Sequence, residues 1–173
     1  HWERVCHALN KYVGSVWAPD LVIYKDMYYI YFPAGGTNWV VSARSPEGPW
    51  SEPVDLRLNG FIDPGHVVGP DGNRYLYLSR GFIVRLAEDG LAVAGEPKYI
   101  YEGWEFPKSW STECFCLESP KSTIRNGYYY LTVAEGGTAG PSTSHMVVSA
   151  RSESPLGPFQ NSPFNPVIHT SDR

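Results

Sequence analysis

Short apolar runs that alternate with polar turns predict β-hairpins along the whole chain. Three pairs of runs, rich in β-branched and aromatic residues, lie at 21–24 and 28–32, 66–68 and 75–78, and 121–124 and 128–133. The turn of the second pair contains Asp71-Gly72 and that of the third contains Asn126-Gly127, which are strong hairpin signals. A further β-like run follows each pair, at 40–45, 82–86 and 147–152. The pattern therefore predicts antiparallel units of three or more strands.

The three hairpins share features that mark them as copies of one repeating unit. An acidic residue at or near a proline opens each copy, at Asp20, Asp63 and Glu118, with intervals of 43 and 55 residues. The first and third copies also share the run Val-Val-Ser-Ala-Arg-Ser, at 40–45 and 147–152. Repeats of about 40–50 residues with three or four strands each are typical of β-propellers. A β-sandwich is the alternative, but it leaves the repeated acids unexplained.

We therefore expect an all-β chain that contains about three propeller blades. Their approximate bounds are 16–58, 59–103 and 112–163. Propellers usually have about four to eight blades, so the remaining blades are expected from the same gene or from another chain. Residues 2–5 are predicted to form the last strand of a preceding blade, and residues 165–168 to approach a following one.

Composition and charge exclude several other classes of protein. The chain has 17 Gly and 15 Pro among 173 residues, which breaks up any long helix, and its aromatic content of 14% argues against disorder. The net charge of −4, without a cluster of Lys or Arg, excludes a nucleic-acid partner, and no apolar run is long enough for a membrane span. Cys6, Cys114 and Cys116 predict neither a disulfide framework nor a four-ligand metal site. Free thiols favour the cytoplasm, but the compartment stays open between cytoplasm and secretion.

The acids that open the repeats are candidates for chemistry. The innermost strands of a propeller begin near its axis, so Asp20, Asp63 and Glu118 are expected to converge on one funnel. Converging carboxylates repel each other and separate their pKa values, so that one can donate a proton while another stays ionised. Glycoside hydrolysis requires such a pair. Aromatic residues near the acids are candidates for stacking on sugar rings, namely Trp17, Phe32, Trp39, Phe61 and Phe115.

Each candidate also has a purely structural interpretation. An Asp beside Pro is often a turn residue or a cap, and Tyr-rich strands usually serve packing. Glu113 is the main rival of Glu118 as the acid, and a solvated or turn position is favoured for Glu135. The spacing of the histidines indicates no metal site.

Three segments together resemble glycoside hydrolase family 43, the five-bladed β-xylosidases and α-L-arabinofuranosidases. They are 16–20 (VWAPD), 62–66 (IDPGH) and 117–121 (LESPK), the last followed by 126–132 and 135–138. The resemblance implies that Glu118 is the general acid and that Asp63 is the auxiliary aspartate that tunes the pKa of this acid. It implies that Trp17 lines the sugar subsite, and it gives Asp20 a place in a recurrent motif without a catalytic role.

One family residue is absent from the sequence. The family's general base is an aspartate ahead of the Trp-Ala-Pro-Asp motif, and residues 1–16 contain no Asp. We expect the base outside this chain, an inverting mechanism on xylo- or arabino-oligosaccharides, and little activity of the chain alone. No cofactor is required by the resemblance, although a structural calcium ion is compatible with the complete propeller. A non-catalytic sugar-binding propeller and a kelch-type interaction propeller are the alternatives.

Overall fold

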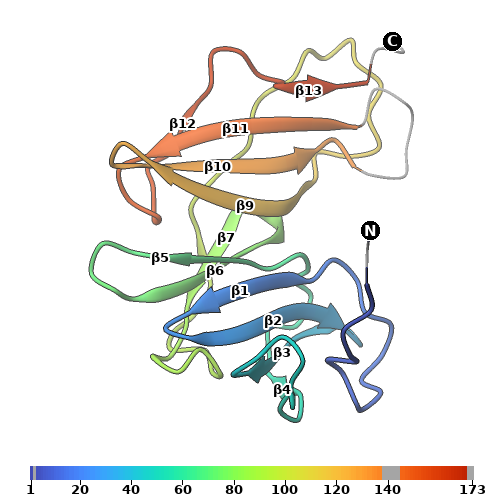
Figure 1. The fold of residues 1–173 in the computed structure, drawn as a ribbon. Coiled ribbons are helices and arrows are strands. Elements are labelled where there is room, and N and C mark those ends of the chain that lie inside the picture. Colours follow the sequence, from blue (N-terminus) through green and yellow to red (C-terminus); the bar gives the residue numbers. More distant parts are fainter. Residues whose placement is uncertain (2, 138–144, 171–173) are drawn as a thin grey trace.

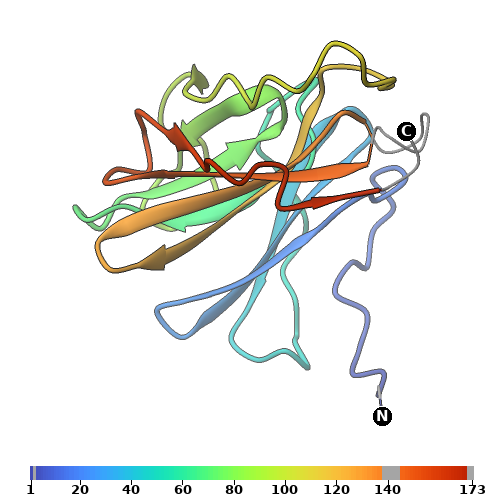
Figure 2. The ribbon, with the colours of Figure 1, turned by 90° about the horizontal axis from the view of Figure 1, so that it is seen from above.

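The computed structural model describes residues 1, 3–137 and 145–170. Its strands form three antiparallel sheets, in which each strand pairs with the next along the chain, except that the last strand of the third sheet pairs with the strand two before it. Figure 1 shows the sheets one above another, with the first at the bottom and the third at the top. Viewed from above, the strands of the first and third sheets run at an angle to each other (Figure 2). Because a meander of four antiparallel strands is the blade of a β-propeller, the predicted all-β class is confirmed.

The bounds of the strands follow the hairpin pattern of the sequence. The first sheet contains β1 (Asp20–Tyr24), β2 (Met27–Ala34), β3 (Thr37–Ala43) and β4 (Val54–Asp55). The second contains β5 (Gly65–Val68), β6 (Arg74–Leu78), β7 (Phe82–Arg85) and β8 (Lys98–Tyr99), with the short 3-10 turn η1 (Ser79–Gly81). The third contains β9 (Leu117–Arg125), β10 (Tyr128–Glu135), β11 (Met146–Ser152), β12 (Gln160–Asn161) and β13 (Ile168–His169).

The two ends of the chain differ from the sequence prediction. Residues 3–5 form no strand, so the predicted preceding strand is wrong for them, and Trp2 lies outside the described residues. Ile168 pairs with Val147 and thereby joins the third sheet instead of leading away from it. The reason is that β12 pairs only with the end of β11, at Ala150 and Arg151, and leaves the backbone groups at the start of β11 free to pair with β13.

The middle sheet is buried on both of its faces. Leu76 and Leu78 on β6 pack with the first sheet, whereas Tyr75 and Tyr77 pack with the third. All five residues of β6 are buried, which explains why its sequence shows no alternation of apolar and polar residues. The two apolar layers between the sheets fix how the inner strands lie relative to one another.

Phe32 lies in a third apolar layer, on the outer face of the first sheet. Its side chain is only 2% exposed and packs with Val41, beneath Leu9 and Val13 of the N-terminal segment. Phe32 therefore lies in the core and does not face a funnel. The period of β2 places Phe32 opposite Tyr31, but only the folded chain shows that residues 9–13 return to cover this face.

Candidate active site at the starts of the inner strands

The first strands of the three sheets are neighbours, and their starts bring the three repeat acids together. β5 contacts both β1 and β9. Asp20 is the first residue of β1, Asp63 precedes β5 by two residues, and Glu118 is the second residue of β9. Hydrogen bonds that cross from sheet to sheet join the three starts, so the beginnings of the three inner strands are in direct contact.

Asp20 links the first sheet to the other two. Its Oδ2 accepts a hydrogen bond of 2.8 Å from the backbone N–H of His66. Its Oδ1 lies 2.8 Å from the Nζ of Lys121 on β9 and forms an ion pair with it. Both carboxylate oxygens of Asp20 are thus engaged with the protein itself, which gives this residue a linking position between the sheets.

Asp63 links the second sheet to the third, next to Glu118. Its buried Oδ2 accepts hydrogen bonds from the backbone N–H of Ser119 at 3.1 Å and from the Ser119 hydroxyl at 3.2 Å. Asp63 and Ser119 both have left-handed backbone conformations, with φ of 56° and 48°. Non-glycine residues adopt such angles only where the surroundings enforce them. The contact between Asp63 and Ser119 is therefore a fixed feature of the site.

Glu118 is half-buried and lies opposite Ala134 in the pairing of β9 with β10. It is the direct chain neighbour of Ser119, so the contact between Ser119 and Asp63 brings the backbone of Glu118 close to Asp63. Its sequence rival Glu113 is exposed in the loop before β9, where its backbone N–H bonds to the carbonyl of Gly136. Of the two, Glu118 is the one that adjoins Asp63.

A pocket of about 360 Å³ lies between the turn after β2 and residues 60–62, and none of the three acids lines it. Trp17, which is 60% exposed, and Phe61 both contribute to its walls, together with the turn at Gly35 and Gly36. Ile62 belongs to the same lining and directly precedes Asp63. Pockets with aromatic walls and a few polar groups suit small ligands such as sugars. The structure thus places two of the predicted stacking residues together, near one of the acids.

Phe115 lies elsewhere, in the loop that leads into β9. Its side chain is 55% exposed, and its ring lies 5.5 Å from that of Phe106. It does not line the pocket of Trp17 and Phe61. The flanking residues Cys114 and Cys116 form a disulfide, which corrects the prediction that the cysteines stay unpaired. The odd number of cysteines obscured this disulfide in the sequence, because Cys6 is a free cysteine and the other two form the pair.

Arg74 is a buried cation that contacts His66, the residue whose backbone N–H binds Asp20. Arg74 donates hydrogen bonds to the hydroxyl of Tyr31 at 2.9 Å and to Nε2 of His66 at 3.1 Å. Burial, assisted by the positive charge of Arg74, lowers the pKa of His66 to about 4. His66 is therefore neutral at physiological pH and can accept this bond, while its backbone N–H holds Asp20.

Glu135 is a buried carboxyl group that the sequence interpretation placed wrongly in solvent or in a turn. Its side chain is 0% exposed, and its Oε2 accepts a hydrogen bond of 3.0 Å from the backbone N–H of Trp104. Its Oε1 has no partner among the described residues. Burial raises the pKa of Glu135 to about 7. The alternation of side chains along β10 could have indicated this burial, because Glu135 shares its face with the core residues Leu131 and Val133.

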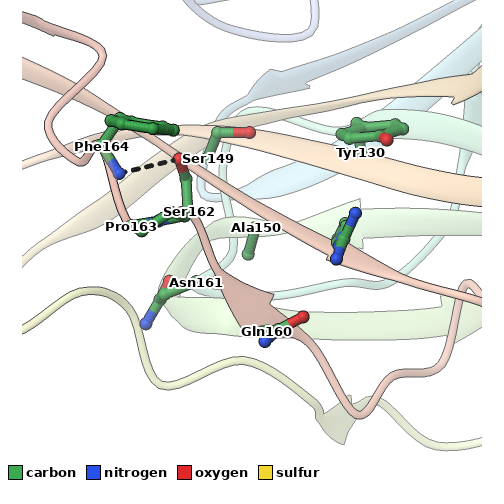
Figure 3. A pocket seen from close by; sticks show the side chains of 9 residues that line it. Tyr130, Ser149, Ala150, Gln160, Asn161, Ser162, Pro163 and Phe164 are labelled. Carbon is green, nitrogen blue, oxygen red and sulfur yellow. Dashed lines mark hydrogen bonds between the residues drawn. The ribbon is translucent and has the colours of Figure 1, made fainter.

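A second pocket, of about 400 Å³, lies on the outer part of the third sheet (Figure 3). Its walls come from β10, β11, β12 and the turn that follows, including Tyr130, Asn161 and Phe164. Figure 3 shows the bond between the Phe164 N–H and the Ser162 hydroxyl that shapes this turn. None of the predicted site residues lines this pocket, so it is separate from the acidic cluster.

Residues 1, 3–137 and 145–170 contain neither a cluster of metal-ligating side chains nor a membrane-spanning helix. Across these ranges, no group of three or more His, Cys, Asp or Glu is arranged to hold a metal ion. Over the same part of the chain, no helix is long and apolar enough to cross a membrane.

Taken together, the blades and the cluster define the chain as part of a β-propeller with carboxylates at the starts of its inner strands. A sequence profile described as glycosyl hydrolases family 43 matches residues 1–173. The chain belongs to this family, and the expectation from the sequence motifs is confirmed.

Individual relatives agree with this assignment. The chain is 33% identical over 201 residues to a xylan 1,3-β-xylosidase from Vibrio sp, and this match covers 97% of this chain and 35% of the relative. It is 30% identical to a non-reducing end α-L-arabinofuranosidase from Bacteroides ovatus, with 97% of this chain and 33% of the relative covered. A crystal structure of a family 43 protein from Bacillus licheniformis has a TM-score of 0.81 at 30% identity, with 99% and 36% of the two chains covered. The chain thus spans about a third of the length of these relatives and contains three blades of the five-bladed fold.

Proposed function

We propose that the complete protein that contains this chain hydrolyses β-xylosidic or α-L-arabinofuranosidic bonds of plant cell-wall polysaccharides. The observation that carries the proposal is the pair of hydrogen bonds from Ser119 to the buried carboxylate of Asp63. Ser119 directly follows Glu118, so these bonds join the two predicted catalytic positions. The relatives named as a xylosidase and an arabinofuranosidase support the substrate class. The partner of the site is accordingly a xylo- or arabino-oligosaccharide.

In the proposed reaction, Glu118 is the general acid. Its proton passes to the glycosidic oxygen while the bond from this oxygen to the anomeric carbon breaks, and the bonding electrons stay with the leaving oxygen. Water attacks the anomeric carbon from the opposite face and gives a proton to a carboxylate base, so the configuration inverts. Asp63, which is held by its contact with Ser119, is proposed as the auxiliary aspartate that modulates the pKa of this acid.

The base of this reaction is proposed to lie outside the chain. Residues 1–16 contain no Asp, whereas the family pattern has the base ahead of Trp17. In an inverting enzyme the base stands about 6.5–9.5 Å from the acid, which leaves room for the water. The remaining blades would supply this carboxylate, so we expect the chain alone to turn over aryl glycosides far more slowly than the complete protein.

Trp17, Phe61 and Asp20 are the proposed contacts on the sugar side. The rings of Trp17 and Phe61 line the 360 Å³ pocket next to Asp63, where they can stack on the pentose. Asp20, which holds His66 and Lys121, borders the same cluster. Phe115, which is exposed in the loop before Glu118, is proposed to contact a more distant sugar unit of the chain.

The test is substitution of the proposed acid in the complete protein. Glu118→Gln should lower kcat on phenyl xyloside or phenyl arabinofuranoside by about 10²- to 10⁴-fold and leave the fold intact, because the amide cannot donate the required proton. Glu153→Gln, the same change at an exposed turn residue, is the matched control and should be silent. An unchanged rate for Glu118→Gln would remove this residue from the role of acid.

A non-catalytic sugar-binding propeller is the second candidate, and the aromatic pocket of Trp17 and Phe61 supports it. The same aromatic pocket would then bind oligosaccharides without cleaving them. Isothermal calorimetry separates the two functions. Micromolar binding of xylo- or arabino-oligosaccharides without any product, measured on the complete protein, would support the binding function and contradict the hydrolase.

A further inference from the structure

The ammonium group of Lys121 lies at the meeting point of the three sheets. Lys121 is on β9, three residues after Glu118, and its side chain is 45% exposed. Its Nζ lies 2.8 Å from Oδ1 of Asp20 and 2.8 Å from the backbone carbonyl oxygen of Pro64. One cation on the third sheet therefore holds the start of the first sheet and the start of the second.

The carbonyl group that Lys121 binds belongs to the residue directly after Asp63. On the other side of Pro64, Gly65 lies so close to β9 that a Cβ atom there would stand 2.0 Å from the carbonyl oxygen of Pro120. The segments 63–65 and 119–121 thus touch at three successive points. These points are the bonds from Ser119 to Asp63, the close approach of Gly65 to Pro120, and the bond from Lys121 to Pro64.

The electrostatic surroundings make the cation hard to replace. The Asp20 side chain is only 16% exposed, and its other donor is the backbone N–H of His66. Without the ammonium group, a mostly buried carboxylate would lose its only ion-pair partner among the described residues. The Asp20 carboxylate and the Pro64 carbonyl would also lose the donor that they share. We therefore expect the segment around Asp20, Pro64 and Glu118 to rearrange when Lys121 is lost.

We propose that Lys121 is a positioning residue for the acid and its auxiliary aspartate. By holding Pro64 against β9, it keeps Asp63 on Ser119 and thereby fixes where the Glu118 proton is delivered. The inference rests on the proposed hydrolase function, because it assigns Lys121 a part in proton donation by Glu118. The role that we assign to Lys121 does not require this residue to contact the sugar.

The experiment uses leaving groups that need different amounts of acid assistance. The complete protein with Lys121→Met is compared with wild type on the phenyl and the 2,4-dinitrophenyl glycoside of the pentose it hydrolyses. A phenoxide leaving group needs protonation, whereas dinitrophenoxide leaves with little help, so misplacing the acid penalises only the first. We expect kcat on the phenyl glycoside to fall at least about tenfold, kcat on the dinitrophenyl glycoside to fall less than about threefold, and KM to change less than about twofold.

Lys98→Met is the matched control, because Lys98 is exposed on the outer strand β8. Equal losses of kcat on both glycosides, or wild-type rates on both, would overturn the role of Lys121. If Lys121→Met does not fold, Lys121→Gln removes the charge but keeps a donor group, and it is judged by the same comparison of kcat on the two glycosides. Glu118→Gln in the same assay tests the proposed function separately. If wild type hydrolyses neither glycoside, the hydrolase proposal fails. If Glu118→Gln is silent, Glu118 is not the acid and the inference about Lys121 fails with it, whereas a selective loss there with an unselective Lys121→Met defeats only the inference about Lys121.

Discussion

Glu135→Gln should increase the stability of the protein near neutral pH far more than in mild acid. The carboxyl group of Glu135 is fully buried, and its one described hydrogen bond comes from the backbone N–H of Trp104. The amide of Gln keeps an oxygen that can accept this bond but carries no charge that must be buried. The protonated carboxyl group and the amide are similar in shape and both neutral, so they are comparable when the pH is low.

The magnitude follows from the pKa of Glu135, which burial raises from 4.5 to about 7. Since one pKa unit corresponds to about 1.4 kcal/mol, ionisation costs the folded state up to about 3 kcal/mol more than the unfolded state. The unfolded chain ionises first, because its Glu has the lower pKa. The contribution of neutral Glu135 is therefore complete below pH 4.5, decreases as the pH rises, and is lost above about pH 7.

Urea denaturation of wild type and Glu135→Gln at several values between about pH 4.5 and 7.5 measures this effect. The free energy of unfolding of the variant minus that of wild type should grow by up to about 3 kcal/mol across this range. Glu105→Gln is the control, because Glu105 is exposed in the same loop as Trp104 and should give a constant difference. Parallel stability profiles for wild type and Glu135→Gln would refute the reasoning, since they would mean that the buried group does not ionise with a raised pKa.

Two further changes test the contacts behind the site. Arg74→Met should lower the free energy of unfolding by about 3 kcal/mol, because it leaves the buried Tyr31 hydroxyl and the His66 ring without their hydrogen-bond donor. Arg74→Lys should not restore this stability. Full stability of either variant in urea denaturation would contradict the assignment. Gly65→Ala should lower the melting temperature and kcat together, because the new Cβ atom would stand 2.0 Å from the carbonyl oxygen of Pro120. We expect the free energy of unfolding to fall by more than about 2 kcal/mol. An unchanged melting temperature would show that β5 and β9 are free to separate.

Much of the fold could be predicted because each blade forms locally. The strands of a blade are consecutive in the chain, so hairpin turns such as Asn126-Gly127 and the shared run at 40–45 and 147–152 record its pattern directly. The predicted third strand at 82–86 corresponds to β7. The failures concern contacts between distant segments. Neither the pairing of Ile168 with Val147 nor the cover over Phe32 leaves a local signal.

The candidate site shows the same division. The acids stand out in the sequence because they recur beside prolines at the start of each unit, and the family motifs add roles to Asp63 and Glu118. Lys121 stands in one of those motifs but has no visible role there, because its partners Asp20 and Pro64 lie on other blades. Packing between blades depends on distances that no spacing along the chain records.

The sequence alone therefore determined the strand units, their repetition, the family and the acids that the repeats carry, because all of these are properties of contiguous residues. The tertiary structure decided which groups touch. It joined Asp63 to Ser119, Lys121 to the other two sheets, and Cys114 to Cys116, and it buried Glu135 deeply enough to raise its pKa. Burial and the meeting of blades arise only when three sheets pack together, and these two effects set the charge states and positions on which the proposed chemistry depends.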